Sequence, residues 1–266
     1  MGAIAEGLAR LDAGVSWTTL TTGWDDGGGW VGCSDLLDDP RRLLAWHRDV
    51  AGAHHRQDDA GLLTGQGLVL DWYLAAVTVP AVGLFHLDRR VPELAPGRLA
   101  LRLDVPGSPP AATALEPGEF GCLPRDPAAS EVGARVVDDL EALVTVLRTQ
   151  LNNHAAHLLD AYAQTTRIGR HGLWAAVTDA VDVAFLVAGW VGGDMARAAA
   201  GAAHTLGAAP LVGESTLHQI EDERGRSHWT RRRYSCCYLY RAPGQTACVT
   251  CPRVSAAERR RQAVHW

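Results

Sequence analysis

The stretch HGLWAAVTDAVDVAFLVAGW, residues 171–190, is apolar on nearly every face of a helix. A helix without a polar face is stable in a globular protein only where other elements surround it. We therefore predict a helix over His171–Trp190 at the centre of the molecule, with the rest of the chain packed around it.

Helical spacing also occurs on both sides of this stretch. Asp39 followed by Pro40 is typical of a helix start, and the apolar spacing after it predicts a helix to about Arg56. A second helical region begins near Thr64, and Pro80 should kink or divide it. Another helix is expected over Asp194–Leu206, ending at Gly207. The longest amphipathic stripe consists of Leu140, Val144, Leu147, Leu151, His154, Leu158 and Tyr162.

Other segments have the period of strands. Between Arg98 and Asp104, leucine occupies every second position, which indicates a half-buried strand. The segment Glu116–Glu119 has Pro and Gly where a type II turn needs them, so we predict a hairpin around it. A second hairpin is expected within 215–233, around Glu223–Arg226. These patterns predict an α+β fold, mostly helical, with a small antiparallel sheet and a C-terminal cluster-binding segment.

Composition excludes several classes of enzyme. All 25 basic residues are arginine, and the 266-residue sequence contains no lysine. P-loop NTPases and protein kinases need a lysine at the nucleotide phosphates, and pyridoxal-phosphate enzymes need one to form a Schiff base with the cofactor. Gly27, Gly28 and Gly29 lack the spacing of a dinucleotide fingerprint and are expected to form a surface turn. The protein therefore has no evident means of taking hydride from a nicotinamide or a flavin.

No targeting or membrane segment is evident. The first residues, Met1–Gly14, include Glu6, Arg10 and Asp12 and lack a continuous apolar run. The longest apolar stretch, Leu74–Leu87, is shorter than the roughly 20 residues that a spanning helix needs. We therefore expect a cytoplasmic protein.

Four of the six cysteines lie within 16 residues near the C-terminus, as a vicinal pair, ten intervening residues and a Cys-x-x-Cys. In a reducing compartment such a cluster indicates a metal site rather than disulfides. Zinc sites are usually built from two Cys-x-x-Cys turns, whereas a [2Fe–2S] cluster needs two thiolates on each of two irons. The spacing favours iron–sulfur over zinc without excluding zinc. The four are Cys236, Cys237, Cys248 and Cys251.

The part of the chain that contains the four cysteines also differs in net charge from the rest. Residues 231–266 have a net charge of +7, whereas the other 230 residues have a net charge of −12. If Arg231, Arg232 and Arg233 form a strand, the first and third project to one face beside Cys236. We consider Arg231 and Arg233 as a docking site for an electron donor or a siderophore, and Arg259–Arg261 as solvated surface. We divide the chain into a body, 1–208, and a C-terminal cluster-binding region, 209–266.

The end of the chain resembles the FhuF-type ferric siderophore reductases. The resemblance rests on Cys-Cys-x10-Cys-x-x-Cys after a run of arginines, and more loosely on Arg89-Arg90-Val91-Pro92 before Leu99–Asp104 and on Arg167–Arg170 before Leu173-Trp174. It implies a [2Fe–2S] cluster on Cys236, Cys237, Cys248 and Cys251, and one-electron reduction of Fe(III) in an imported siderophore. We expect Cys248 and Cys251 to share one iron and the vicinal pair the other.

The resemblance also implies the partners. They are a ferric siderophore, in our interpretation of the hydroxamate type, a ferredoxin-like or other one-electron donor, and a siderophore importer in transient contact. Nucleic acid is not expected, since the chain as a whole is acidic. The alternative is a protein stabilised by a structural zinc site that binds a siderophore or a partner without electron transfer. Cys122 is expected to be a small buried residue, and His154 a histidine in the core or at its edge. Cys33 and Cys122 are expected to be dispensable for the cluster.

Overall fold

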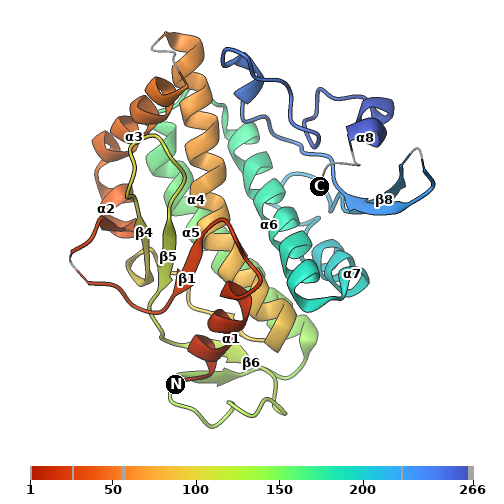
Figure 1. Ribbon diagram of the computed structural model, residues 1–266. Coiled ribbons are helices and arrows are strands. Elements are labelled where there is room, and N and C mark those ends of the chain that lie inside the picture. The colour runs from red at the N-terminus through yellow and green to blue at the C-terminus, as the bar shows by residue number, and fades with distance from the viewer. Residues whose placement is uncertain (1, 26, 55–57, 223, 263–266) are drawn as a thin grey trace.

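Helix α6 (Arg170–Gly192) runs through the middle of the molecule, which confirms the central helix predicted for residues 171–190. The computed structural model describes residues 2–25, 27–54, 58–222 and 224–262. Helix α4 (Asp59–Asp88) packs along one side of α6, and the C-terminal region lies on the other side (Figure 1). The fold is α+β and mostly helical, as predicted.

Helix α4 is a single element of 30 residues. Pro80 lies inside it and does not divide it, contrary to one of the two outcomes predicted. A proline within a helix costs about 3 kcal/mol because one hydrogen bond is lost. Here Pro80 is buried, and Thr78 beside it donates a hydrogen bond to Ala180 O of α6 (3.2 Å). Packing against α6 therefore holds the helix together across the proline.

The other helices agree with the predicted spacing. Helix α3 (Pro40–Ala53) begins at the predicted proline and ends before Arg56, which lies outside the described residues. Asp194 caps α7 (Met195–Thr205) by accepting from Arg197 N at 3.0 Å. The long stripe forms α5 (Leu140–Ala163). The short helices are α1 (Ala3–Asp12), α2 (Cys33–Asp38), α8 (Ala256–Gln262) and the 3₁₀ turns η1 (Pro96–Arg98) and η2 (Leu239–Arg241).

The strands form three small sheets. The first has the order β1-β5-β4-β2, the second β3-β6-β7, and the third is the hairpin β8-β9. Two pairs, β1 with β5 and β6 with β7, are parallel, so the first two sheets are mixed, whereas β8-β9 is antiparallel. The strands are β1 (Thr19–Thr21), β2 (Trp30–Gly32), β3 (Val91–Pro92), β4 (Leu99–Arg102), β5 (Ala112–Leu115), β6 (Phe120–Cys122), β7 (Ala134–Val136), β8 (His218–Glu221) and β9 (Ser227–Thr230).

One of the two predicted hairpins is wrong. Strand β5 pairs with β1 and β4, whereas β6 pairs with β3 and β7 in another sheet. The turn at Glu116–Glu119 therefore joins two sheets: Glu116 N donates to Arg98 O on one side, and Glu93 N donates to Glu119 O on the other. The hairpin β8-β9 is confirmed, although Glu223 in its turn lies outside the described residues. Gly28 and Gly29 are exposed, with positive φ, as in a surface turn.

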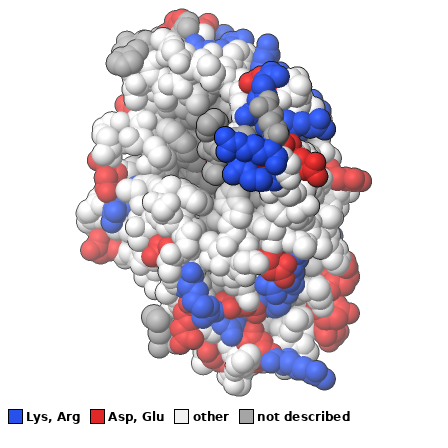
Figure 2. All heavy atoms as spheres, turned by 45° about the vertical axis from the view of Figure 1, so that its right-hand side comes forward, with Lys and Arg blue, Asp and Glu red and all other residues white. Residues whose placement is uncertain are grey.

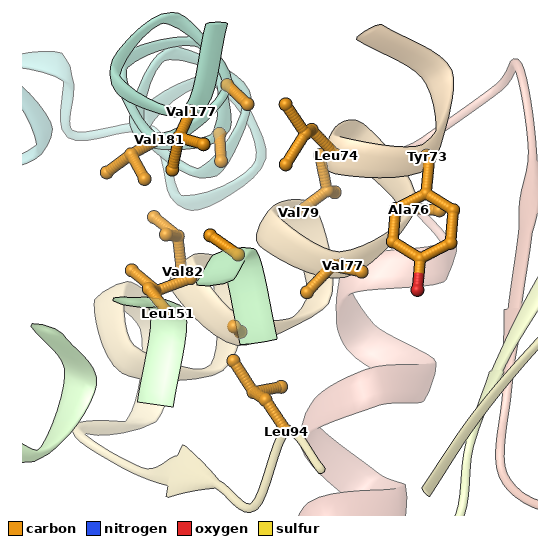
Figure 3. Packing of buried hydrophobic residues seen from close by; sticks show 14 of the residues in the cluster. Tyr73, Leu74, Ala76, Val77, Val79, Val82, Leu94, Leu151, Val177 and Val181 are labelled. Atoms are coloured by element: carbon orange, nitrogen blue, oxygen red, sulfur yellow. The ribbon is translucent and has the colours of Figure 1, made fainter. Parts of the chain in front are cut away.

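The core lies where α4, α5 and α6 meet. Figure 3 shows Leu74 and Val82 of α4 beside Val177 and Val181 of α6, with Leu151 of α5 below them. His154 is part of this core: its Nε2 lies 3.0 Å from the Tyr73 hydroxyl and its Nδ1 lies 2.5 Å from Leu94 O. Cys33 and Cys122 are fully buried, and burial raises the pKa of Cys33 to about 12. The predictions for Cys122 and His154 are confirmed.

Helices α4 and α6 are long and apolar enough to cross a membrane by length and composition alone. Helix α4 extends well beyond the apolar stretch that we singled out in the sequence. In each helix, 78% of the most apolar window is buried within the protein. Such burial is expected of the core helices of a globular protein.

Candidate metal centre

The segment that leads into the first two cysteines is held by a buried carboxylate of α6. Asp179 is 2% exposed and accepts hydrogen bonds from Tyr234 N (2.9 Å), Ser235 N (2.8 Å) and the Ser235 hydroxyl (2.6 Å). A buried carboxylate must be paired, and backbone N–H groups satisfy it well. Asp179 therefore fixes the backbone directly before Cys236.

Helix α4 holds the same segment from the other side. Thr64, Gly67 and Asp71 are spaced along one face of this helix. A Cβ atom on Gly67 would lie 2.5 Å from Cys237 O, so the backbone of Cys237 packs directly onto the helix. The Thr64 hydroxyl donates to Tyr238 O at 3.2 Å. The vicinal cysteines are thus positioned by the backbones and side chains of two core helices.

The structure corrects the role that we expected for Arg231 and Arg233. The two side chains do point to the same side, but that side faces inward, and they are 8% and 10% exposed. Arg233 donates to both carboxylate oxygens of Asp71 at 2.6 Å, and Arg231 donates to Asp179 O at 2.8 Å. Their charges are neutralised within the fold, so they do not form the exposed basic docking site that we expected.

The second cysteine motif is brought over the first. Arg233 N donates to Thr250 O at 2.9 Å, which joins the irregular segment before the vicinal pair to the Cys-x-x-Cys turn. Within that turn, Cys251 N donates to Cys248 O, also at 2.9 Å. Gly244, with φ of 72°, lies in the loop that reverses the chain between the motifs. The structure therefore brings together all four cysteines that the spacing singled out.

The side-chain contacts of the cysteines run across the two motifs. Cys237 is hydrogen-bonded to Cys248, and Cys236 to Cys251. Tyr238, in the left-handed conformation with φ of 60°, turns its N–H back to Cys236 Sγ at 3.4 Å. These contacts join each vicinal cysteine to one member of the Cys-x-x-Cys. Which two cysteines share an iron stays a prediction.

The contact between Cys237 and Cys248 shifts the pKa values of the two thiols in opposite directions. The Cys237 thiol donates to Cys248 and, against the opposing effect of burial, lowers the pKa of Cys248 to about 6, helped by the charge of Arg233. The same hydrogen bond, together with burial, raises the pKa of Cys237. Cys237 and Cys251 are buried, whereas Cys236 and Cys248 are partly exposed. Cys236 also lines a cavity of about 190 Å³ between the vicinal pair and helices α4 and α6.

The terminal arginines differ in their environment. Arg259, which we expected on the surface, is 5% exposed and donates to Val249 O (2.8 Å) and Val254 O (2.9 Å). It thereby satisfies carbonyls of the turn that carries Cys251. Arg260 and Arg261 are exposed, as expected. The exposed arginines of the C-terminal region also include Arg232, Arg241 and Arg253.

The donor set consists of four cysteine thiols from two motifs that the fold brings together. Thiolates are ligands both of zinc and of iron–sulfur clusters. A [2Fe–2S] cluster takes two thiolates on each of two irons, which is the number of cysteines present here. The four cysteines could hold such a cluster.

Sequence reasoning missed the residues that position the cysteines. Asp179 and Asp182 both lie within the helix that is otherwise apolar, and Asp182 accepts from the hydroxyls of Ser215 (2.7 Å) and Thr216 (2.8 Å). Two carboxylates in an apolar helix must have buried partners, so they were a signal that could have been used. Gly67 and Thr64 gave no comparable signal, because small residues are common in helices that pack closely.

One comparison with known proteins gives a match. A family model described as "Ferric iron reductase FhuF-like transporter" matches residues 68–221. The match covers most of α4 and all of α6, with Asp71 and Asp179, and ends before the four cysteines. No curated protein and no solved structure matches the chain.

Proposed function

Because this chain belongs to the FhuF-like ferric iron reductase family, we propose that it reduces siderophore-bound Fe(III) by one electron. In this proposal Cys236, Cys237, Cys248 and Cys251 hold a [2Fe–2S] cluster. The observation that carries the proposal is that the fold brings the two cysteine motifs together, with Arg233 N donating to Thr250 O at 2.9 Å and Cys237 in contact with Cys248.

Bound to these thiolates, a [2Fe–2S] cluster supplies single electrons at a potential that can be low. The substrate explains why one electron is enough: siderophore oxygens are hard ligands that hold Fe(III) much more tightly than Fe(II). The chain itself contributes rigidity, because Asp179 and the Asp71–Arg233 ion pair fix the cysteine segment on two core helices. It also contributes access, since Cys236 and Cys248 are partly exposed.

The exposed arginines of the C-terminal region support the proposal that the electron donor is an acidic protein, such as a ferredoxin. Figure 2, which turns this side forward, shows basic side chains gathered on the upper part of the face, above a mixture of acidic and basic ones. Such a field raises the rate of encounter with an acidic partner. We place the reaction in the cytoplasm, where an imported siderophore would meet the protein.

Anaerobic purification followed by stopped-flow spectroscopy tests the proposal. The protein should be red-brown, contain about two irons and two sulfides per chain, and be reoxidised by a ferric hydroxamate after reduction with dithionite. Replacing any of the four cysteines by serine should remove or shift the visible spectrum, whereas Cys122→Ser should leave it unchanged. A colourless protein that contains zinc, or a reduced cluster that ferric siderophore does not reoxidise, would contradict the proposal.

A further inference from the structure

An apolar groove lies on the face of α6 that turns away from α4. Its floor is a helical stripe of Val183, Leu186, Val187 and Trp190. Trp17, from the loop before β1, and Trp229, from β9, line it as well. Its volume is about 240 Å³. The groove thus brings together three indole rings from three separate parts of the chain.

The groove reaches the cysteine site. Thr250 is one of its lining residues, and the Thr250 hydroxyl lies 3.8 Å from Cys248 Sγ. Thr250 is also the residue directly before Cys251. A ligand in the groove would therefore be separated from the cysteine pairs by little more than one threonine side chain.

The groove offers aromatic surface with little net charge. Arg231 is the charged residue in its lining, and that guanidinium is held by Asp179, with Nη1 3.7 Å from the carboxylate. Trp17 and Trp190 are 54% and 46% exposed, which is unusual for side chains of this size. Exposed aromatic side chains around a concavity are typical of a binding site for an apolar ligand.

We propose that this groove binds an apolar arm of the ferric siderophore, with the iron directed towards Thr250 and the cysteines. This inference rests on the proposed function. The groove is smaller than the ~300–1,000 Å³ of pockets that enclose a whole ligand, so it accommodates one arm of the molecule. Neutral lining favours the uncharged polymethylene chains of a hydroxamate siderophore over a highly anionic catecholate complex, whose burial here would lack counter-charges.

Calorimetric titration with the gallium(III) complex of a linear trihydroxamate separates binding from reduction, because gallium(III) accepts no electron. The complex should bind the wild-type protein and should bind the double variant Trp17→Ala, Trp190→Ala at least about tenfold more weakly, a loss of about 1.4 kcal/mol. Trp24→Ala removes a partly exposed indole that does not line the groove and serves as the matched control. It should bind like the wild type.

The outcomes of this experiment test the groove proposal separately from the proposed reductase function. If the wild type reduces a ferric hydroxamate but the double variant binds the gallium complex equally well, the groove proposal is wrong and the proposed function stands. If the wild type reduces a ferric hydroxamate but does not bind the gallium complex at all, the groove proposal is likewise wrong and the proposed function stands. If the double variant binds normally but accepts electrons more slowly from a ferredoxin, the groove is a docking site for the donor and our assignment is overturned.

Discussion

At the scale of single residues, the site depends on buried charges that compensate one another. Asp179 lies between Arg231 and Arg233, with its carboxylate 3.6–3.7 Å from each guanidinium, and it also holds the backbone before Cys236. Removing one partner from such an arrangement leaves an uncompensated charge in the interior. Single residues beneath the cysteines should therefore matter as much as the cysteines for keeping the site assembled.

We expect Asp179→Asn to lower the free energy of unfolding by about 3–5 kcal/mol, because two buried guanidinium groups lose their common counter-charge. Urea unfolding measures this change, and iron content should fall with it. Asp160→Asn provides a control, since Asp160 is exposed and lies 4.0 Å from Arg170 at the surface. Equal stability of the two variants would show that Asp179 is not an anchor.

A second expectation concerns the metal-free protein. Since the Cys237 thiol lowers the pKa of Cys248 to about 6, one thiolate should be present at neutral pH. Absorbance at about 240 nm, followed from pH 5 to 9, should show it forming near pH 6, well below the usual pKa of a cysteine, about 8.5. Cys237→Ala removes the donor and should move this step towards higher pH, whereas Cys122→Ala should not.

At the scale of elements, α4 and α6 work as a platform for a segment that has little regular structure of its own. Between Arg231 and Thr250, the described chain includes one short 3₁₀ turn, and its backbone is held by groups on the two helices. Close approach is possible because α4 has glycine where Cys237 packs against it. The surface of the helix therefore decides where the vicinal cysteines lie.

We expect Gly67→Ala to displace Cys237, since the new methyl group would lie 2.5 Å from Cys237 O. The variant should stay folded, because the core on the other faces of α4 is untouched, yet bind iron poorly. Circular dichroism and iron analysis measure the two properties. Gly52→Ala, in α3 with open space around it, should instead be neutral or stabilise the protein by about 0.5–1 kcal/mol. Normal iron content in Gly67→Ala would contradict the close packing.

At the scale of the whole molecule, charge is separated between an acidic body and a basic C-terminal region. Because Arg231 and Arg233 are buried, the long-range field must come from arginines at the surface, among them Arg232, Arg253 and Arg260. Exposed charges act over about 8–10 Å in physiological salt. The partner that such a field attracts is an acidic one.

We therefore expect Arg232→Glu with Arg260→Glu to slow electron transfer from an acidic ferredoxin by about tenfold or more at low ionic strength. The difference from the wild type should shrink as salt is added. Arg42→Glu with Arg48→Glu, at two exposed arginines of α3, makes the same change of charge and should have little effect. Stopped-flow measurements at several salt concentrations would detect a loss that does not depend on salt, which would point to a structural defect.

The sequence by itself determined the features that depend on local pattern. Apolar periodicity located α5, because a helix shows its buried face every three to four residues, and an apolar stretch of helical length located α6. The four cysteines stood out because their chemistry and spacing are local too. These features need no knowledge of what lies across the molecule.

Only the tertiary structure decided which partners each group meets. The spacing of Arg231 and Arg233 predicted that their side chains point to one side, but not whether that side faces solvent or the interior. Ion pairs with Asp71 and Asp179 place it in the interior. Likewise, β5 and β6 are neighbours along the chain but pair with strands of different sheets. The two cysteine motifs are joined by a hydrogen bond between Arg233 N and Thr250 O, which lie on separate segments of the chain. Contacts between distant segments depend on the packing of the whole chain, which local periodicity does not encode.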